Sequence, residues 1–190
     1  FPPAREDPVI RSAFAAVWGG STMATFPDAR PVVGWGQMLP RYFKNPSQVD
    51  NRALSGRSTK SFIDQGHWGK VIGDLRGGDF LIMCWGTNDS AHDPARHTEP
   101  RKDFQANLER FIREIRAKGA MPVIATAVAR RAWNENGEFV EPSSDYVTVT
   151  REVAARARTR GDAGGTSIAI VFLHAYANPR HEAQAAAIVS

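Results

Sequence analysis

Residues 13–24 read Ala-Phe-Ala-Ala-Val-Trp-Gly-Gly-Ser-Thr-Met-Ala. The apolar run over residues 13–18 predicts a buried strand, because a short continuous run of such side chains fits a strand that is covered on both faces. Gly19 and Gly20 follow, and glycine lets the backbone turn sharply without a Cβ clash. Ser21 is therefore expected beyond the carboxyl end of this strand, where open α/β sheets hold their ligands. The alternative is an ordinary Gly-Gly-Ser turn.

Strand and helix patterns alternate along the rest of the chain. Further strands are predicted over residues 48–54, 80–85, 121–127 and 168–173, and helices over residues 34–44, 58–75, 102–118, 145–160 and 179–189. The run over residues 80–85 is continuously apolar, as expected at the centre of a parallel sheet. Alternating strands and helices imply βαβ crossovers. The expected fold is therefore α/β, a three-layer α/β/α sandwich of flavodoxin-like type, in a single domain over residues 1–190.

Local signals refine three of these segments. Gly66 is expected to break the helical region over residues 58–75. Asp145 is the expected N-cap of the helix that follows it, because a short acidic side chain can accept from the first free N–H groups. Residues 130–144 are expected to form a long polar connection with a turn at Asn136-Gly137.

Length and composition are those of one globular domain. A chain of 190 residues, 42% of them hydrophobic, can bury a full core. No apolar run approaches the roughly 20 residues that span a bilayer. The lone cysteine, Cys84, can form no internal disulfide, and no Cys/His cluster has zinc-like spacing, so neither a metal nor a cofactor is expected. The chain begins at Phe1 without a visible signal peptide, so export cannot be read directly from the sequence.

The formal net charge is +4, and several arginines cluster between Arg151 and Arg160. Such a cluster can be a nucleic-acid patch or a solvated helix face. The second interpretation is favoured, and no nucleic-acid partner is expected. A mild positive field would also favour a polyanionic substrate.

Two further fragments follow the serine turn in a fixed order. They are Asn51-Arg52-Ala53-Leu54-Ser55-Gly56-Arg57-Ser58 and Trp85-Gly86-Thr87-Asn88-Asp89. From about residue 13 to about residue 153, the chain resembles the SGNH (GDSL-like) hydrolases, and most closely the rhamnogalacturonan acetylesterases. The resemblance implies a five-stranded parallel sheet in the order 2-1-3-4-5. It also implies an esterase that removes acetyl groups from a carbohydrate through an acyl-serine intermediate.

Ester hydrolysis needs a nucleophile, a base and donors for the oxyanion. By the resemblance, Ser21 is the nucleophile, and the donors are the backbone N–H groups of Ser21 and Gly56 and the side chain of Asn88. Glycine lets the backbone approach a substrate closely, and an asparagine amide donates without adding charge. Taken singly, Gly56 is also compatible with a plain turn and Asn88 with an Asx turn. The family's serine motif usually reads Gly-Asp-Ser, and here Gly20 replaces the aspartate.

The base is expected in the C-terminal part, which from about residue 160 is shorter than in the family. The family places Asp-x-x-His before its last helix, and the best alignment makes His174 the base with Val171 in place of the aspartate. A rival alignment takes residues 168–173 as the fifth strand, so that this block is absent. His181 is a second candidate. A Ser–His pair without the carboxylate can still act, more slowly. The alternative is an impaired relative that binds carbohydrate without efficient hydrolysis.

Substrate contacts are expected from aromatic rings and arginines. Trp35, Trp85 and Trp133 can stack on sugar rings, and Arg130 or Arg131 can pair with uronate carboxylates. The alternatives are core packing for Trp85 and surface solvation for the arginines. The expected partner is an acetylated, pectin-type polysaccharide, with no membrane partner and a monomeric state. The resemblance further implies a secreted or periplasmic protein.

Overall fold

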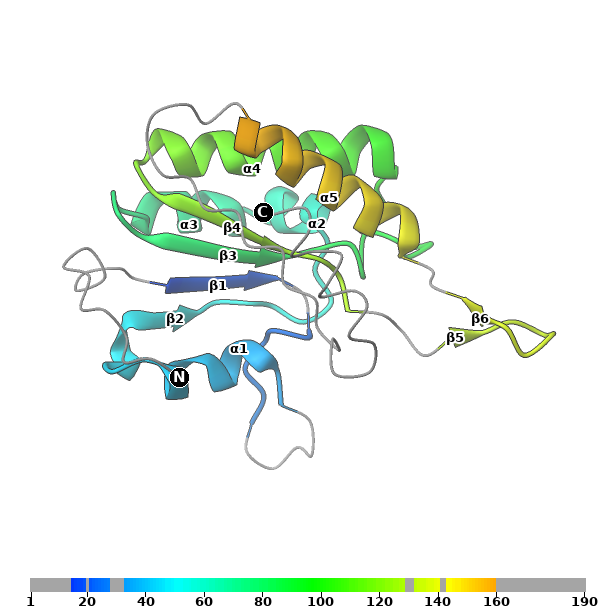
Figure 1. The fold of residues 1–190 in the computed structure, drawn as a ribbon, viewed down its shortest axis with the longest axis horizontal. Helices are drawn as coiled ribbons and strands as arrows, with labels where there is room; N and C mark the ends of the chain where they lie inside the picture. Colours follow the sequence, from blue (N-terminus) through cyan, green and yellow to red (C-terminus); the bar gives the residue numbers. More distant parts are fainter. Residues whose placement is uncertain (1–14, 20, 28–32, 129–131, 141–142, 160–190) are drawn as a thin grey trace.

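Four parallel strands form the sheet. The computed structural model describes residues 15–19, 21–27, 33–128, 132–140 and 143–159 (Figure 1). The strands are β1 (Ala15–Gly19), β2 (Val49–Asn51), β3 (Phe80–Cys84) and β4 (Met121–Ala125), in the order β2-β1-β3-β4. Neighbours are parallel throughout, and Ala15 lies opposite both Val49 and Phe80. The predicted parallel sheet is confirmed for these strands, and the strand predicted over residues 168–173 lies outside the described residues.

Helical segments connect the strands. They are α1 (Trp35–Met38), α2 (Thr59–Asp64), α3 (His67–Asp74), α4 (Gln105–Ala117) and α5 (Ser144–Thr159), with 3-10 turns at Leu39–Tyr42 and Pro46–Gln48 and a π-helical turn at Pro100–Phe104. A capping box begins α2, because the side chains of Ser58 and Ser61 each accept from the other's backbone N–H. Gly66, at a φ of 74°, separates α2 from α3, as the sequence predicts.

The sheet carries one core on each face. In β3, Leu81 and Met83 are buried in the larger core, whereas Cys84 and the partly buried Ile82 belong to the smaller one. This division follows from strand geometry, since successive side chains point to opposite faces. Helices α2 to α5 supply the larger core with residues such as Trp68. Helix α1 and the residues after β1 supply the smaller core.

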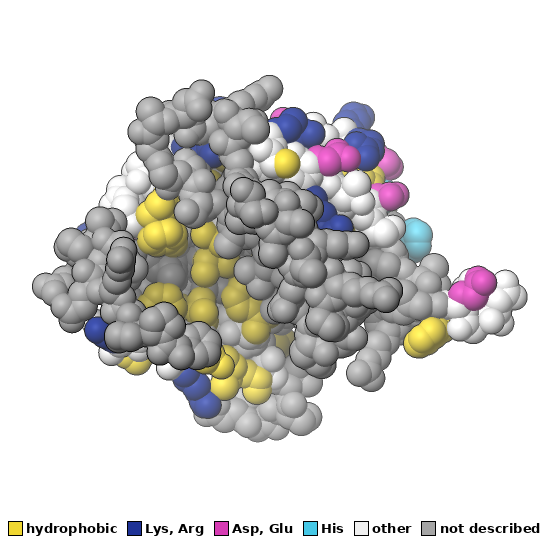
Figure 2. Space-filling view, viewed as in Figure 1, with side chains coloured by type: hydrophobic (Ala, Val, Ile, Leu, Met, Phe, Trp, Pro, Cys, Tyr) yellow, Lys and Arg dark blue, Asp and Glu magenta, His cyan; other side chains and the backbone are white. Residues whose placement is uncertain are grey.

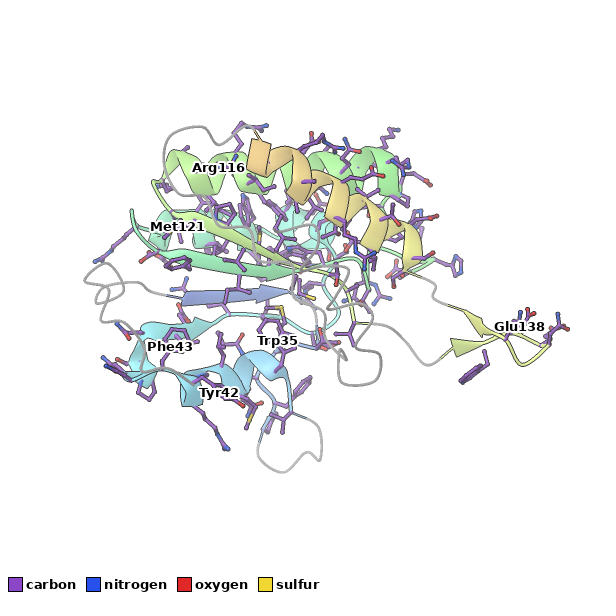
Figure 3. The ribbon with its side chains drawn as sticks, viewed as in Figure 1. Trp35, Tyr42, Phe43, Arg116, Met121 and Glu138 are labelled. Carbon is purple, nitrogen blue, oxygen red and sulfur yellow. The ribbon has the colours of Figure 1, made fainter. Side chains whose placement is uncertain are left out.

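A small hairpin replaces part of the irregular connection predicted over residues 130–144. Strands β5 (Ala132–Trp133) and β6 (Phe139–Val140) pair in antiparallel fashion. The turn predicted at Asn136-Gly137 is present, with Gly137 at a φ of 74° and its N–H donating to the carbonyl oxygen of Asn134. The hairpin projects beyond the side to which the arrows of the parallel strands point (Figure 1). Figure 3 accordingly shows Glu138 of the hairpin and Met121 at the start of β4 on opposite sides of the described structure.

The start of α5 differs from the prediction by one position. The helix begins at Ser144, so Asp145 lies inside its first turn and is not its N-cap. A carboxylate there still interacts favourably with the helix N-terminus.

The outer faces of α4 and α5 carry paired charges. Arg156 lies 3.2 Å from Glu109, and Arg101 lies 2.9 Å from Glu152. Figure 2 shows basic and acidic side chains interleaved in this region. The arrangement supports the solvated helix face over a basic patch. In the part of the chain that the structure describes, no helix combines the length and the apolar composition of a membrane span.

Candidate active site

Ser21 begins the turn that directly follows β1, in a half-buried position. Its carbonyl oxygen accepts from the N–H of Ala24 at 3.3 Å. The N–H of Trp35 donates to the carbonyl oxygen of Thr22 at 3.0 Å. Gly34 packs so tightly against this turn that a Cβ there would lie 2.1 Å from the carbonyl oxygen of Ala24. The segment that opens α1 therefore fixes the backbone of the serine turn.

Asn51, the last residue of β2, ties the serine turn to the next fragment. Its Nδ2 donates to the carbonyl oxygen of Met23 at 2.8 Å, and its Oδ1 accepts from the N–H of Ala53 at 3.1 Å. The sequence motif alone indicates no role for Asn51. The role of Asn51 could have been inferred from its place at the end of the predicted second strand. That strand pairs with β1, where Val17 lies opposite Asn51.

Gly56 occupies a turn at a φ of 73°, a conformation that glycine adopts without strain. No atom lies within 4 Å of the position that a Cβ would take. A substituent would therefore meet backbone strain there and no steric clash.

The side chain of Asn88 is held in one orientation. Its Nδ2 donates to the carbonyl oxygen of Arg57 at 2.9 Å, and an amide nitrogen carries two N–H donors. One donor is therefore used to fix the amide, and the other has no partner among the described residues, so it can bind a ligand. Ser21 and Asn88 line the same small pocket, whose lining among the described residues is Ser21, Thr22, Arg57, Cys84, Trp85, Gly86, Thr87 and Asn88. The structure thus places two of the predicted catalytic residues, Ser21 and Asn88, in one pocket. Arg57, which follows Gly56 in the chain, lines the same pocket.

Asp89, which follows Asn88 and has no exposed surface, joins the segments around this pocket. Its Oδ1 accepts from the N–H of Thr59 at 3.0 Å, from the hydroxyl of Thr59 at 2.5 Å and from the hydroxyl of Thr98 at 3.1 Å. Its Oδ2 accepts from the N–H of Gly86 at 3.1 Å. Burial raises the pKa of Asp89 to about 6, against the opposing effect of these hydrogen bonds. The sequence places Asp89 in the fragment of residues 85–89 but indicates no role for its side chain.

Asp89 should make the free energy of unfolding fall as pH rises. Its carboxyl group holds a proton up to about pH 6 when folded, whereas the ordinary value is 3.8, so the folded state binds more protons between these values. That difference corresponds to roughly 3 kcal/mol at 1.36 kcal/mol per pKa unit. Denaturant unfolding gives the free energy of unfolding of wild type and of Asp89→Asn. The amount by which the wild-type value exceeds that of the variant should shrink by about this much between pH 4 and pH 7.

Asp93→Asn is the matched control for this prediction. The Asp93 carboxylate accepts hydrogen bonds from Ala95 and Arg96, which lower its pKa. Its contribution has the opposite sign, because it is present above the unfolded pKa and is lost as pH falls. A constant difference between wild type and Asp89→Asn over the same pH range would contradict the raised pKa of Asp89.

The three tryptophans expected at the substrate surface occupy different environments. Trp85 is only 3% exposed and packs against Phe62 with ring centroids 5.2 Å apart, so its ring is a core residue and not a sugar platform. The prediction for Trp85 is corrected because the strand's alternation turns this residue toward the larger core. Trp35, the first residue of α1 and labelled in Figure 3, is partly buried against the smaller core. Trp133 is 65% exposed.

Several predicted residues lie outside the described residues. They are Gly20, Arg130, Arg131, Val171, His174 and His181. The described histidines, His67, His92 and His97, are absent from the lining of the pocket. Among the described residues, no group of three or more metal-ligating side chains is present. Burial raises the pKa of the Cys84 thiol to about 12, as suits a small buried side chain.

Solved structures share this fold. The Bacillus subtilis protein YxiM aligns with a TM-score of 0.70 at 22% identity, over 91% of this chain and 47% of that one. Axe2, an acetylxylan esterase from Geobacillus stearothermophilus, aligns with a TM-score of 0.58 at 17% identity, over 76% of this chain and 72% of that one. These likenesses concern the fold alone.

Curated sequences give higher identities. The probable rhamnogalacturonan acetylesterase YesY of Bacillus subtilis is 37% identical over 138 residues, and the rhamnogalacturonan acetylesterase RhgT of the same organism is 34% identical over 137 residues. Each alignment covers 72% of this chain, but only 63% of YesY and 58% of RhgT. The profile of the GDSL-like Lipase/Acylhydrolase family matches residues 17–177. The chain therefore belongs to the GDSL-like lipase/acylhydrolase family.

Proposed function

We propose that the chain is a serine carboxylester hydrolase that removes acetyl groups from a carbohydrate. The observation that carries the proposal is the pocket that Ser21 and Asn88 share. A hydroxyl nucleophile and a fixed, uncharged amide donor are what acyl transfer from an ester needs at one place. Family membership and the acetylesterase names of two relatives support the same reaction.

In the proposed mechanism, the Ser21 hydroxyl oxygen attacks the acetyl carbonyl carbon, and a base takes the hydroxyl proton. The negative charge that develops on the carbonyl oxygen is stabilised by the free N–H of the Asn88 amide and by the backbone N–H groups of Ser21 and Gly56. As this intermediate collapses, the bond to the sugar oxygen breaks, the protonated base gives its proton to that oxygen, and the sugar hydroxyl leaves while acetyl-serine remains. Water, activated by the same base, then releases acetate.

We propose His174 as the base. The family match extends to residue 177 and therefore includes it. Val171 stands where the family has the aspartate that orients the histidine. A Ser–His pair of this kind lacks the carboxylate that fixes the imidazole tautomer, so turnover is expected to be slow. For the same reason, carbohydrate binding without efficient hydrolysis is the second candidate function.

The proposed substrate is an acidic, acetylated polysaccharide of the pectin type. Two relatives are named rhamnogalacturonan acetylesterases, and the net charge of +4 favours a polyanion. Within the substrate-binding surface, Trp35 and Trp133 are the proposed ring-stacking residues, and Arg130 and Arg131 the proposed partners of uronate carboxylates. We further propose that the protein is secreted or periplasmic. It is proposed to act as a monomer and to bind no nucleic acid.

Acetate release from acetylated polysaccharides tests the proposed function. Wild-type chain should release acetate several-fold faster from acetylated pectin than from acetylated xylan, and added salt should slow only the pectin reaction, because salt screens charge attraction. Equal, salt-independent rates on both polymers would remove the acidic substrate. Binding of either polymer without any release of acetate would favour the second candidate function.

A further inference from the structure

Arg57 is the one charged residue among the described residues that line the pocket with Ser21 and Asn88. Its backbone carbonyl oxygen accepts the hydrogen bond that fixes the Asn88 amide. Arg57 also follows Gly56 directly in the chain. Its side chain is therefore anchored within the same loop that would hold the reacting ester.

The guanidinium of Arg57 is oriented by neutral partners. Its Nη1 donates to the carbonyl oxygen of Ser55 at 2.9 Å, and its Nε donates to Oε1 of Gln65 at 2.8 Å. Among the described residues, no carboxylate lies within ion-pair distance of it, and its Nη2 makes no hydrogen bond. The group is thus held in place while its positive charge and the two N–H donors of Nη2 stay available.

Two other described arginines, Arg52 and Arg110, differ in this respect. Arg52 contacts the carboxylates of Asp50 and Asp74, and Arg110 lies 2.7 Å from Glu114. The unneutralised charge of Arg57 is felt nearby, since it lowers the pKa of His67 after the larger effect of burial. Arg57 lines the pocket, and its guanidinium is held in place with no carboxylate partner among the described residues. Such a cation is suited to an external anion.

We propose that Arg57 binds a carboxylate of the substrate, that of a uronate unit beside the acetylated sugar. This inference rests on the proposed function, and it assigns the acidic substrate class to a residue inside the pocket. A guanidinium donates charge-assisted hydrogen bonds to a carboxylate, and a neutral acetylated sugar offers no such acceptor. Arg57 would therefore select uronate-containing esters at the site of reaction.

Two variants that remove the same charge from different places test the assignment. Arg57→Gln removes the proposed contact. Arg76→Gln is the matched control, because it lowers the net charge by the same amount. Arg76 is an exposed residue before β3, at the amino ends of the strands and therefore away from the pocket. For Arg57→Gln, the ratio of kcat/KM on an acetylated galacturonate oligosaccharide to that on an acetylated xylo-oligosaccharide should fall about 10- to 100-fold, mainly through KM. For Arg76→Gln, the ratio should change less than about twofold.

A binding measurement separates this inference from the proposed function. Trigalacturonate without acetyl groups is titrated into the Ser21→Ala chain by calorimetry, with xylotriose as the neutral probe. Adding Arg57→Gln should raise the Kd for trigalacturonate about tenfold or more, and Arg57→Lys should recover part of the loss, because it restores the charge without the planar fork.

Three results would overturn the role of Arg57. They are an unchanged Kd in Arg57→Gln, an equal loss in Arg76→Gln, and no detectable binding of trigalacturonate to the parent chain. Absence of acetate release from every ester would refute the proposed hydrolysis instead, and the binding result would still decide the role of Arg57.

Discussion

Replacing Ser21 by alanine is expected to remove acetyl ester hydrolysis, with a fall in kcat of about 10²-fold or more, the loss that remains for a serine nucleophile when the orienting carboxylate is already missing. The reason is chemical, because alanine cannot form the acyl intermediate. The fold should persist, since the hydrogen bond that holds this residue in its turn uses its carbonyl oxygen, which accepts from the N–H of Ala24. Release of p-nitrophenol from p-nitrophenyl acetate gives the rate, and thermal unfolding monitors the fold.

Ser144→Ala is the matched control for this substitution. Ser144 is an exposed serine at the start of α5 and does not line the pocket. Its replacement should leave kcat within about twofold, as for a surface substitution away from special features. If Ser21→Ala keeps more than about a tenth of the wild-type kcat, Ser21 is not the nucleophile.

Asn88→Ala is expected to lower kcat by about 10²–10³-fold, the usual cost of losing one oxyanion donor. The substitution removes both amide N–H groups, the one that donates to the carbonyl oxygen of Arg57 at 2.9 Å and the one left for the substrate. Because the free donor interacts most strongly with the charged transition state, KM should change much less than kcat. Steady-state kinetics on the same acetyl ester measure both parameters.

Asn107→Ala controls for the loss of an amide hydrogen bond near the pocket. Its Nδ2 donates to the hydroxyl of Thr59 at 3.0 Å, and the residue is not part of the pocket lining. Its melting temperature should fall by an amount similar to that of Asn88→Ala, whereas its kcat should fall less than about tenfold. Equal kcat losses in the two variants would mean that Asn88 acts only through the structure of its loop.

Strands β3 and β4 could be predicted from the sequence because their side chains are buried or partly buried along the whole strand. Such strands read as short apolar runs, and Phe80–Cys84 lies within the run predicted over residues 80–85. The hairpin β5–β6 could not be predicted in the same way. Its strands have two residues each, and Asn134, Glu135 and Asn136 between them carry the polar pattern of a loop.

The candidate site could be predicted only in part. Ser21, Gly56 and Asn88 stand in motifs at the ends of strands, and a motif identifies residues by their spacing along the chain. The contacts of Arg57 and Asp89 depend on which loops meet in space, and spacing does not contain that information. Trp85 was assigned to the substrate surface because its position in the motif does not show what its ring packs against. Its ring packs against Phe62 from α2, and only the folded chain shows this contact.

The buried carboxylate of Asp89 has a consequence for how the pocket can open. One side chain accepts hydrogen bonds from the start of α2, from the turn after β3 and from the loop at Thr98. No one of these segments can move away without leaving a buried charge short of a donor, which is costly in a protein interior. The three segments therefore form a single cooperative opening unit, so that the amides of Thr59 and Gly86 become accessible to hydrogen exchange in the same event. A ligand that orders one of these loops will thereby slow exchange in all three.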